Sequence, residues 1–488
     1  MKDKMRSWWE ESRYIILAFF IPFSILMLAY IAMWITPFGE LSLIISDMQA
    51  QYIDMFSAYR ELMHGNRSLF HSWSQIQGSN MFALMTSYVL SPINLIAAIL
   101  PEEYIVESIT IMTLIRVGLA GASCSWYLKK SFSRNDISIA VFACCYALMG
   151  YNIIFALNIL WLDLVILLPF VIWGVDLIVR DTKKHLFFTI SLIAIFCLNY
   201  YLAYMIGIFS FIYFIYKYLC VYEKDAIKPF FKKLGVFFGG TLVAVLCSAC
   251  ILLPHYYSLG LGTREGFLES DQFAFTLEYD FLTIFTKLFM GSYDTIAYGG
   301  VANIYCGLVI TLLLLLYFMN KNIRFKEKLL SFLMLVFFWF SCVISILYLG
   351  WHLFALPHFF EARFSFIICF FMIIMGYNSY TKLEGISAKN INHVFLVSAA
   401  AAMLIDRMNY RYITDKVVIA TLLFLLLYYL FFIIMQKKEE AQKYYKLIFT
   451  ALVCAELCLN TNMTILNMDE MLNYPSKYDY YEERGKIK

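Results

Sequence analysis

The chain has 488 residues, of which 62% are hydrophobic and only 15% are charged, with a net charge of +3. Soluble globular proteins are about half apolar and about a quarter charged, so this composition excludes a soluble enzyme. Apolar runs of about 20 residues, enough to cross a hydrocarbon core of about 30 Å, recur along the whole sequence. The sequence therefore predicts a polytopic α-helical membrane protein.

Thirteen apolar runs have the character of membrane spans. The first is too long for the apolar core of a signal peptide and no small-residue cleavage site follows it, so we expect an uncleaved anchor. We place the spans at 14–36, 104–128, 136–153, 158–179, 186–200, 201–219, 234–253, 301–319, 329–349, 364–381, 392–410, 416–435 and 446–464. Residues 1–464 then form a single transmembrane domain, an all-α bundle, and 465–488 form a short polar tail.

The stretch 81–100 is apolar, but Ser91-Pro92 and Pro101 interrupt it, and proline breaks helix continuity. If this stretch does not cross and the N-terminus lies inside, the cytoplasmic segments hold 25 of the 38 lysines and arginines, as the positive-inside rule requires. We therefore expect 81–100 to dip into the outer leaflet without crossing. Three outer loops follow from this topology: 37–103, 254–300 and 350–363.

Two outer loops carry amphipathic segments. In the first loop, Tyr52, Met55, Phe56, Tyr59 and Met63 alternate with Gln51, Asp54, Ser57 and Glu61 at helical spacing. In the second, Phe281, Ile284, Phe285, Leu288 and Phe289 lie opposite Thr283, Thr286 and Lys287. We expect both to be interfacial helices on the outer membrane surface, unless they only brace long loops. The twelve cysteines lie almost entirely in apolar runs, so we expect packing roles and no structural disulfide.

Asp47 lies just past the first span, where a charge must be hydrated, paired or used. Partial desolvation near a lipid interface raises the pKa of a carboxyl toward values that suit a general base. Asp47 is our candidate base, although it could instead cap the helix that follows. Asp54, two helical turns on and on the same side, could position an acceptor or bind a divalent cation, or be a solvated surface residue.

Arg363 is the candidate ligand for a phosphate, because its planar fork of donors matches phosphate oxygens and it precedes a span at headgroup depth. Plain snorkelling to the interface is the alternative. His352 in the same loop, and Arg264 and Lys287 in the previous outer loop, are further phosphate candidates. Arg116 lies within a span, where an unpaired charge is costly, so we expect it to pair with a carboxylate.

Several local patterns, in order, resemble the bacterial YfhO family of membrane proteins. They are Asp47 with Gln51-Tyr52; Ser68-Leu69-Phe70 and Ser72-Trp73-Ser74; Gly78, Asn80 and the run from Tyr88 to Asn94; the run from Asn158 to Asp163 with Pro169; Asn199-Tyr200 and Tyr204-Met205; the run from Gly291 to Asp294, then from Asn303 to Gly307; and Trp351-His352, Pro357, Phe360 and the run from Arg363 to Phe366. The resemblance covers residues 14–381 and fades after them.

Two positions depart from the family pattern. Ser46 stands where we expect Gly before the aspartate, and Ala302 where we expect Pro before Asn303. Neither departure removes a candidate catalytic or binding group. Longer members of the family look as though they carry a further C-terminal extracytoplasmic part that these residues lack, which leaves the choice of acceptor open.

The resemblance implies a GT-C fold and glycosyl transfer on the outer face of the bacterial plasma membrane. The donor would be a polyprenyl-phosphate-linked sugar, and the acceptor a cell-envelope glycopolymer such as a teichoic or lipoteichoic acid. Asp47 would be the catalytic base. The candidates for the substrate pocket are Gln51, Tyr52, Asp54, Asn80, Tyr88, Asn158, Trp161, Asp163, Asn199, Tyr200, Asn303 and Tyr305.

We expect the lipid bilayer as a further partner, no nucleic acid, and no cofactor other than a possible divalent cation. Two other interpretations remain open: a transporter or flippase of a lipid-linked glycan, and a non-catalytic membrane assembly factor. The enzyme is favoured because the candidate polar groups cluster on the outer side and no internal repeat of the kind found in many transporters is visible. The sequence indicates neither the sugar, the acceptor nor the oligomeric state.

Overall fold

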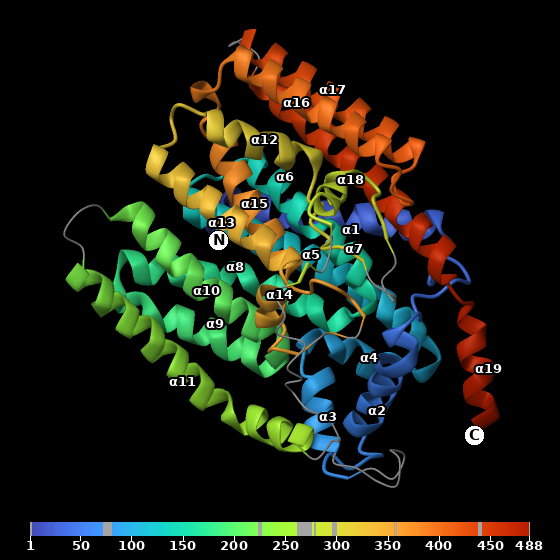
Figure 1. Ribbon diagram of the computed structural model, residues 1–488. Helices are drawn as coiled ribbons and strands as arrows, with labels where there is room; N and C mark the ends of the chain where they lie inside the picture. The colour runs from blue at the N-terminus through green and yellow to red at the C-terminus, as the bar shows by residue number, and fades with distance from the viewer. Residues whose placement is uncertain are drawn as a thin grey trace.

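A computed structural model of the chain describes residues 2–71, 81–222, 227–260, 276–277, 280–294, 300–355, 357, 359–437 and 442–487. All named elements are helices, and the described residues contain isolated β-bridges but no strand. An all-α architecture is therefore confirmed. Figure 1 shows the helices gathered into one bundle.

The first half of the chain builds the centre of the bundle and one flank. Its elements are α1 (Lys2–Ala32), the π-helix η1 (Met48–Tyr52), α2 (Ile53–Met63), α3 (Met81–Tyr88), η2 (Pro92–Asn94), α4 (Leu95–Ile99), η3 (Glu102–Tyr104), α5 (Ile105–Phe132), α6 (Ile137–Ala147), α7 (Gly150–Ile154), η4 (Phe155–Leu157), α8 (Ile159–Arg180), η5 (Thr182–Lys184), α9 (His185–Leu198), α10 (Tyr200–Val221) and α11 (Ile227–Gly260).

The second half completes the bundle. Its elements are the 3₁₀ helix η7 (Thr283–Leu288), α12 (Leu308–Met319), α13 (Phe325–Val343), α14 (Ser345–Trp351), α15 (Ser365–Tyr380), η8 (Leu383–Gly385), α16 (Ala388–Arg407), α17 (Asp415–Lys437), α18 (Gln442–Leu472) and α19 (Lys477–Ile487).

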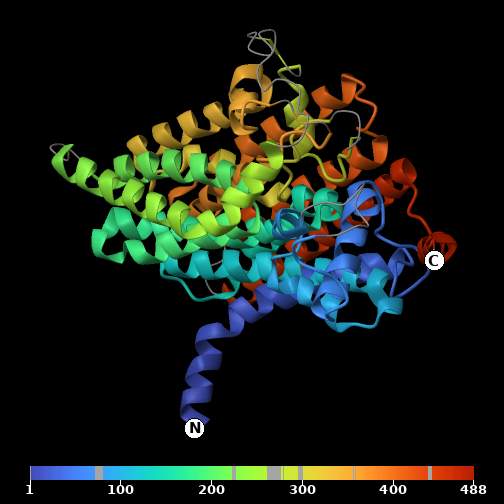
Figure 2. The ribbon, with the colours of Figure 1, turned by 90° about the horizontal axis from the view of Figure 1, so that it is seen from below.

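Helix α5 lies at the centre, where it packs against α1, α6 and α8. From α8 the packing continues outward to α9 and α10, and from α9 to α11. Figure 1 shows α8–α11 along one side, α16–α18 along the other, and the short helices α2, α3 and α4 together at one end. In Figure 2 the beginning of α1 extends away from the body of the bundle.

Among the described residues, eight helices are long and apolar enough to cross a membrane, and α6 with α7 and η4, bent by 46°, would make a ninth span. The other expected spans coincide with α9, α12, α13 and α15, which have between 12 and 19 residues. Helix α12 is short because residues 300–307 are not helical and Gly307 has a positive φ of 104°. A polytopic bundle is thus confirmed, while length and apolarity support fewer than thirteen spans.

The stretch 81–100 is divided among α3, η2 and α4, none long enough to cross a membrane. The division falls at Ser91, whose extended backbone (ψ 130°) precedes Pro92, as steric contact with a proline ring demands. This agrees with the expectation that the stretch does not cross.

Segments that the sequence assigns to the cytoplasmic side lie together. Lys129 Nζ donates to Glu11 O at 2.6 Å, and Arg134 donates to Thr381 O at 3.1 Å. At the opposite end, the predicted outer segments also meet, because Lys477 Nζ lies 3.1 Å from Glu107 Oε1. The grouping of loop ends agrees with the predicted alternation of spans, whereas the side that faces the cytoplasm stays a prediction.

The polar tail packs against the rest of the protein. Helix α18 continues past residue 464 to Leu472, and α19 follows. Ser42 N donates to Pro475 O at 2.9 Å, and Tyr481 OH donates to Glu103 O at 2.6 Å. The tail therefore docks on the first outer loop and on the turn that precedes α5.

The first amphipathic segment is helical as expected, but its apolar face packs into the protein. In α2 the side chains of Ile53 and Phe56 are each 1% exposed, while Asp54 is exposed. Its apolar face thus contributes to the core near η1 rather than only covering lipid.

The prediction for the second segment is wrong. Residues 283–288 form a 3₁₀ helix, in which Thr286 and Lys287 are buried and Phe285 is 40% exposed. A 3₁₀ helix has three residues per turn, so the 3.6-residue pattern does not describe its faces. Lys287 turns inward because it forms an ion pair with Asp294.

Arg116 pairs with a carboxylate, as its position within a span requires. Its Nε and one terminal nitrogen lie 3.1 and 3.0 Å from the two carboxylate oxygens of Asp163, and that terminal nitrogen also donates to Asn94 Oδ1 at 2.7 Å. Ser91 Oγ donates to Asp163 at 3.0 Å. This buried network joins α5, α8 and the break at residue 91.

We predict that Asp163→Asn lowers stability by about 3–5 kcal/mol, because removing one partner leaves a buried charge uncompensated. The double variant Arg116→Met/Asp163→Leu should lose less than the single variant, since it removes both charges. The thermal midpoint of the detergent-solubilised protein measures both effects. A parent-like midpoint for Asp163→Asn would contradict a structural role for the pair.

We predict that residues 37–71 are extracytoplasmic and that Lys130 is cytoplasmic. The test introduces Asn66→Cys or Lys130→Cys after the exposed Cys247 and Cys250 have been replaced by alanine. A membrane-impermeant maleimide should label the cysteine at 66 in intact cells and the one at 130 only after permeabilisation. Labelling at 130 from outside would reverse the proposed orientation.

Candidate functional site

A cavity of about 980 Å³ opens where the ends of α8, α9, α10 and α11 meet η1, α3 and the loop after α14. Its lining includes Asp47, Gln51, Tyr52, Thr86, Tyr88, Leu160, Trp161, Phe196, Cys197, Leu198, Asn199, Tyr200, Tyr201, Ile251, Leu252, His255, Tyr256, His352, Leu353, Ala355, Phe359, Phe360 and Arg363. All of these residues belong to predicted outer loops or to the ends of spans next to them. Binding cavities for small molecules usually occupy about 300–1,000 Å³, so this one lies at the upper end.

Asp47 reaches the cavity because of an unusual local backbone. Ser46 adopts a left-handed conformation with φ 52°, which costs an ordinary residue about 1–2 kcal/mol and costs glycine almost nothing. The glycine that the sequence patterns predict at this position would adopt this conformation without that cost. The π-helix η1 starts directly after Asp47, and such insertions occur frequently at functional sites.

Two side chains of the same pattern anchor η1 to its neighbours. Gln51 Oε1 accepts a hydrogen bond from Tyr88 OH at 2.9 Å, and Tyr52 OH donates to Asn158 Oδ1 at 2.7 Å. These contacts tie the segment to α3 and to the start of α8. The spacing of Asp47, Gln51 and Tyr52 thus combines one charged group with two anchors.

The Asp47 carboxylate makes no capping hydrogen bond, although Asp47 is the residue that precedes η1. The capping alternative is therefore wrong. Partial burial raises the pKa of Asp47 above its ordinary value, and the guanidinium of Arg363 acts in the opposite direction. Asp47 forms no ion pair within the described part of the chain, so its carboxylate remains available in the cavity.

Arg363 lies against the cavity wall. Its guanidinium carbon is 5.2 Å from the ring centres of both Trp161 and Tyr201, within the range of cation–π attraction. Its Nε donates to Phe360 O and a terminal nitrogen donates to Phe359 O, both at 3.2 Å. Contacts with two rings and two carbonyls hold the guanidinium at the cavity, which argues against simple snorkelling.

His352 also lines the cavity, but with a neutral ring. Burial lowers the pKa of His352 to about 3, with a smaller effect of Arg363 in the same direction. Its Nδ1 lies 2.8 Å from Tyr348 O, so Nδ1 carries the proton and Nε2 can only accept. These contacts argue against the predicted role of His352 as a phosphate ligand, because a neutral ring whose one N–H donor is occupied has no donor left for a phosphate oxygen.

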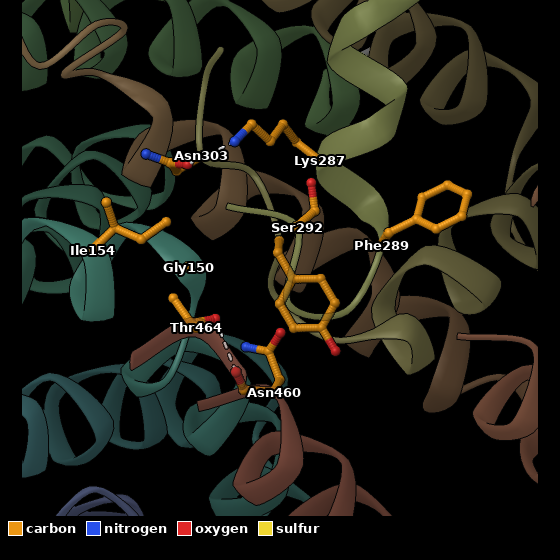
Figure 3. A pocket seen from close by; sticks show the side chains of 9 residues that line it. Gly150, Ile154, Lys287, Phe289, Ser292, Asn303, Asn460 and Thr464 are labelled. Atoms are coloured by element: carbon orange, nitrogen blue, oxygen red, sulfur yellow. Dashed lines mark hydrogen bonds between the residues drawn. The ribbon is translucent and has the colours of Figure 1, made fainter. Parts of the chain in front are cut away.

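Lys287 lies at a different place. It is 1% exposed, pairs with Asp294, and its Nζ is 3.5 Å from Asn303 Oδ1. Figure 3 shows Lys287 and Asn303 on one wall of a small pocket, with Asn460 on the other. That pocket has a volume of about 10 Å³, room for one water molecule.

Burial lowers the pKa of Lys287 and the Asp294 carboxylate opposes this shift. Because the lysine already has an anionic partner and does not reach the large cavity, it is a poor candidate for a substrate phosphate. The structure thus separates Lys287 and Asn303 from Asp47 and Arg363. Tyr305 lies with them, where its hydroxyl donates to Glu456 at 2.6 Å.

The other predicted residues divide into three groups. Gln51, Tyr52, Tyr88, Trp161, Asn199 and Tyr200 line the large cavity together with Asp47. Asn158 stands behind Tyr52, Asp163 is held by Arg116, and Asp54 lies on the exposed face of α2. Asn80 and Arg264 lie outside the described residues.

Tyr201 and His255 also line the cavity, although the sequence patterns predict neither of them. Asn199 Oδ1 accepts a hydrogen bond from Leu202 N at 3.0 Å and caps α10, which begins at Tyr200. Two tyrosines directly after a capping asparagine place Tyr201 at the same end of α10 as Tyr200. His255 was assigned to a loop because the expected span ended at 253, whereas α11 continues to Gly260. The rings of His255 and Tyr200 lie 4.5 Å apart.

No group of three or more His, Cys, Asp or Glu side chains suited to a metal ion occurs among the described residues. Asp47 is the single carboxylate, and Arg363 the single lysine or arginine, among the lining residues named above. These lining residues therefore place one acidic and one basic group in a cavity whose other lining residues include many aromatic side chains.

Comparison with known proteins agrees with this picture. A family model described as bacterial membrane protein YfhO matches residues 18–488, so the similarity continues well past residue 381, where the sequence patterns faded. No curated protein and no solved structure matches the chain. Because the family model covers nearly the whole sequence, the chain belongs to the YfhO family of bacterial membrane proteins.

Proposed function

We propose that the protein is a membrane glycosyltransferase of the GT-C type, which transfers a sugar from a polyprenyl-phosphate donor to a hydroxyl of a cell-envelope glycopolymer. The observation that carries this proposal is that Asp47 and Arg363 line one cavity. The family as such is a membrane protein family, and its description names no substrate. Donor and acceptor are therefore proposed from the sequence resemblance, and the cavity supplies side chains that suit the transfer step.

The transfer step needs a base for the acceptor hydroxyl. Asp47 would take the hydroxyl proton while the acceptor oxygen attacks the anomeric carbon of the donor. The bond from that carbon to the phosphate oxygen breaks, and the polyprenyl phosphate leaves with the bonding electrons. Burial suits this role because it raises the pKa of Asp47, and a base is most effective when its pKa approaches the operating pH.

The leaving phosphate gains negative charge during this step, and a fixed cation stabilises that charge best when no reorganisation is required. Arg363 fits this role because two rings and two carbonyls already hold it. A lysine would supply charge without the planar pair of donors that matches two phosphate oxygens.

A cavity with one carboxylate among the lining residues named above favours transfer that inverts the anomeric carbon. Retaining transfer through a covalent intermediate uses a second carboxylate as nucleophile, and the lining residues named above include none. A single displacement inverts the anomeric configuration. The proposed product therefore has the configuration opposite to that of the donor.

The wall beside the polar groups suits the lipid part of the donor. Phe196, Leu198, Ile251 and Leu252 line the cavity from α9 and α11, and α11 exposes large apolar side chains such as Leu246 and Leu253. A chain entering from the bilayer would meet apolar surface before the phosphate reaches Arg363.

The proposed acceptor class is a teichoic or lipoteichoic acid.

We predict that Asp47→Asn keeps fold and expression but lowers transfer by about 10²–10⁴-fold, the usual contribution of a general base. The assay uses purified protein, a panel of polyprenyl-phosphate hexoses and N-acetylhexosamines, and lipoteichoic acid as acceptor. Asp415→Asn is the matched control, since it neutralises an exposed carboxylate on the same predicted side outside the cavity. Parent-like transfer by Asp47→Asn would reject Asp47 as the base.

We predict that Arg363→Lys and Arg363→Ala lower turnover more than donor affinity, with alanine losing about 10²–10³-fold, as when a transition-state donor is removed. Arg60→Ala is the control, because Arg60 lies outside the cavity and donates to Leu100 O at 3.0 Å. Parent-like kinetics in both Arg363 variants would remove Arg363 from the phosphate site.

We predict that Arg363→Ala also changes the pH dependence of transfer. Because Arg363 holds the pKa of Asp47 down against the effect of burial, its loss should raise that pKa. Asp47 is then protonated up to a higher pH, so the acidic limb of the kcat/KM profile should move upward in Arg363→Ala. An unmoved limb would contradict the electrostatic coupling.

A further inference from the structure

The loop that carries Arg363 has a strained backbone. Of the described non-glycine residues with positive φ, five lie between 353 and 362: Leu353, Phe354, Phe359, Phe360 and Ala362, with φ between 47° and 63°. L-residues rarely adopt this conformation, and it persists only where surrounding contacts fix it. The contacts that fix the turn at 359–362 therefore determine where Arg363 lies.

Tyr348, on α14, supplies those contacts. Its hydroxyl donates to the carboxylate of Glu361 and accepts a hydrogen bond from Ala362 N at 2.9 Å. The ring is 1% exposed and lies 4.4 Å from the ring of His352, whose Nδ1 is 2.8 Å from Tyr348 O. A buried ring of fixed orientation thus holds the turn at two consecutive residues.

The turn at 359–362 also holds the guanidinium of Arg363, because Phe359 O and Phe360 O accept hydrogen bonds from it at 3.2 Å. Both acceptors belong to left-handed residues. If the turn relaxed to an ordinary conformation, both carbonyls would rotate away from Arg363.

We propose that Tyr348 is a positioning residue, whose hydroxyl holds the turn at 359–362 and thereby directs Arg363 toward Asp47 and the substrate phosphate. The phosphate part of this inference rests on the proposed function. The orientation of Arg363 relative to Asp47 does not, so the two parts can be tested separately.

The charged and titratable groups that face Asp47 must be considered before a pH effect is attributed to Arg363. Tyr52 from η1 and Tyr88 from α3 lie close enough to interact with the Asp47 carboxylate. The remaining titratable cavity residues include Tyr200, Tyr201, His255 and His352. Tyr348→Phe changes none of these groups and removes one oxygen atom, so an altered titration of Asp47 would report a moved Arg363.

The first measurement needs no turnover. A hydrophobic carbodiimide labels protonated carboxyls, and mass spectrometry of the Asp47 peptide gives the pH at which labelling falls to half. Tyr348→Phe should move this midpoint upward, in the same direction as Arg363→Ala and by less. Combined with Arg363→Ala, it should add no further shift.

The second measurement is the affinity for farnesyl phosphate in the detergent-solubilised full chain. Tyr348→Phe should weaken binding by about three- to tenfold, the scale of one hydrogen bond. Glu361→Gln should also weaken it, although loss of a negative charge beside an anion site would by itself tighten binding. Farnesol, which lacks the phosphate, should bind the variants and the parent equally.

Tyr317→Phe is the matched control. Tyr317 is also buried, and its hydroxyl bonds to Ser331 at 3.0 Å and to a glutamate, Glu327, at 3.4 Å. Tyr317 is not among the residues that line the cavity. It should change neither the Asp47 midpoint nor farnesyl phosphate affinity.

A parent-like Asp47 midpoint and parent-like affinity in Tyr348→Phe would overturn the proposal. If the parent protein binds farnesyl phosphate and shows the Tyr348 effect but transfers no sugar, the proposed function fails while the positioning role stands.

Discussion

The structure depends on one constraint: in an apolar bundle, a charged side chain needs a partner or a polar cavity. Arg116 is paired with Asp163, and Lys287 with Asp294. Asp47 differs, because it forms no ion pair within the described residues and faces a cavity that Arg363 also lines. Glu456 also forms no ion pair within the described residues, but it is fully buried and accepts hydrogen bonds from the hydroxyls of Tyr305 and Tyr428. Asp47 combines an unpaired carboxylate with a cavity, and that combination makes it available for chemistry.

The charged groups at the site take their positions from strained backbone on both sides. Ser46 directs Asp47, and the turn at 359–362 directs Arg363, with left-handed non-glycine residues in each case. Such conformations are costly and occur preferentially at functional sites. Their presence on both walls of one cavity means that strained main chain places both the base and the cation, and main chain moves less than long side chains do.

The sequence predicted the all-α polytopic fold and much of the cavity, because Asp47, Trp161, Tyr200 and Arg363 all occur next to span ends that meet at one side of the membrane. It misplaced Lys287, because pairing with Asp294 depends on tertiary contacts that spacing does not reveal. The helix over 281–289 was mispredicted for the same reason, since Lys287 has the spacing of an exposed residue but finds a buried partner. The number of spans stays a prediction where helices are short or bent, because apolar length alone does not show where a helix begins.

The far side of the bundle bears on the choice between enzyme and transporter. At the predicted cytoplasmic ends of α5, α8 and α10, Tyr127 OH lies 3.1 Å from Tyr213 OH, which donates to Asp176 at 3.3 Å. Lys217 completes this cluster at 3.2 Å from Asp176. A transporter would have to separate these buried polar contacts in each cycle to open an inner exit. An enzyme that acts from one side needs no such opening, so these contacts favour the proposed transferase over a flippase.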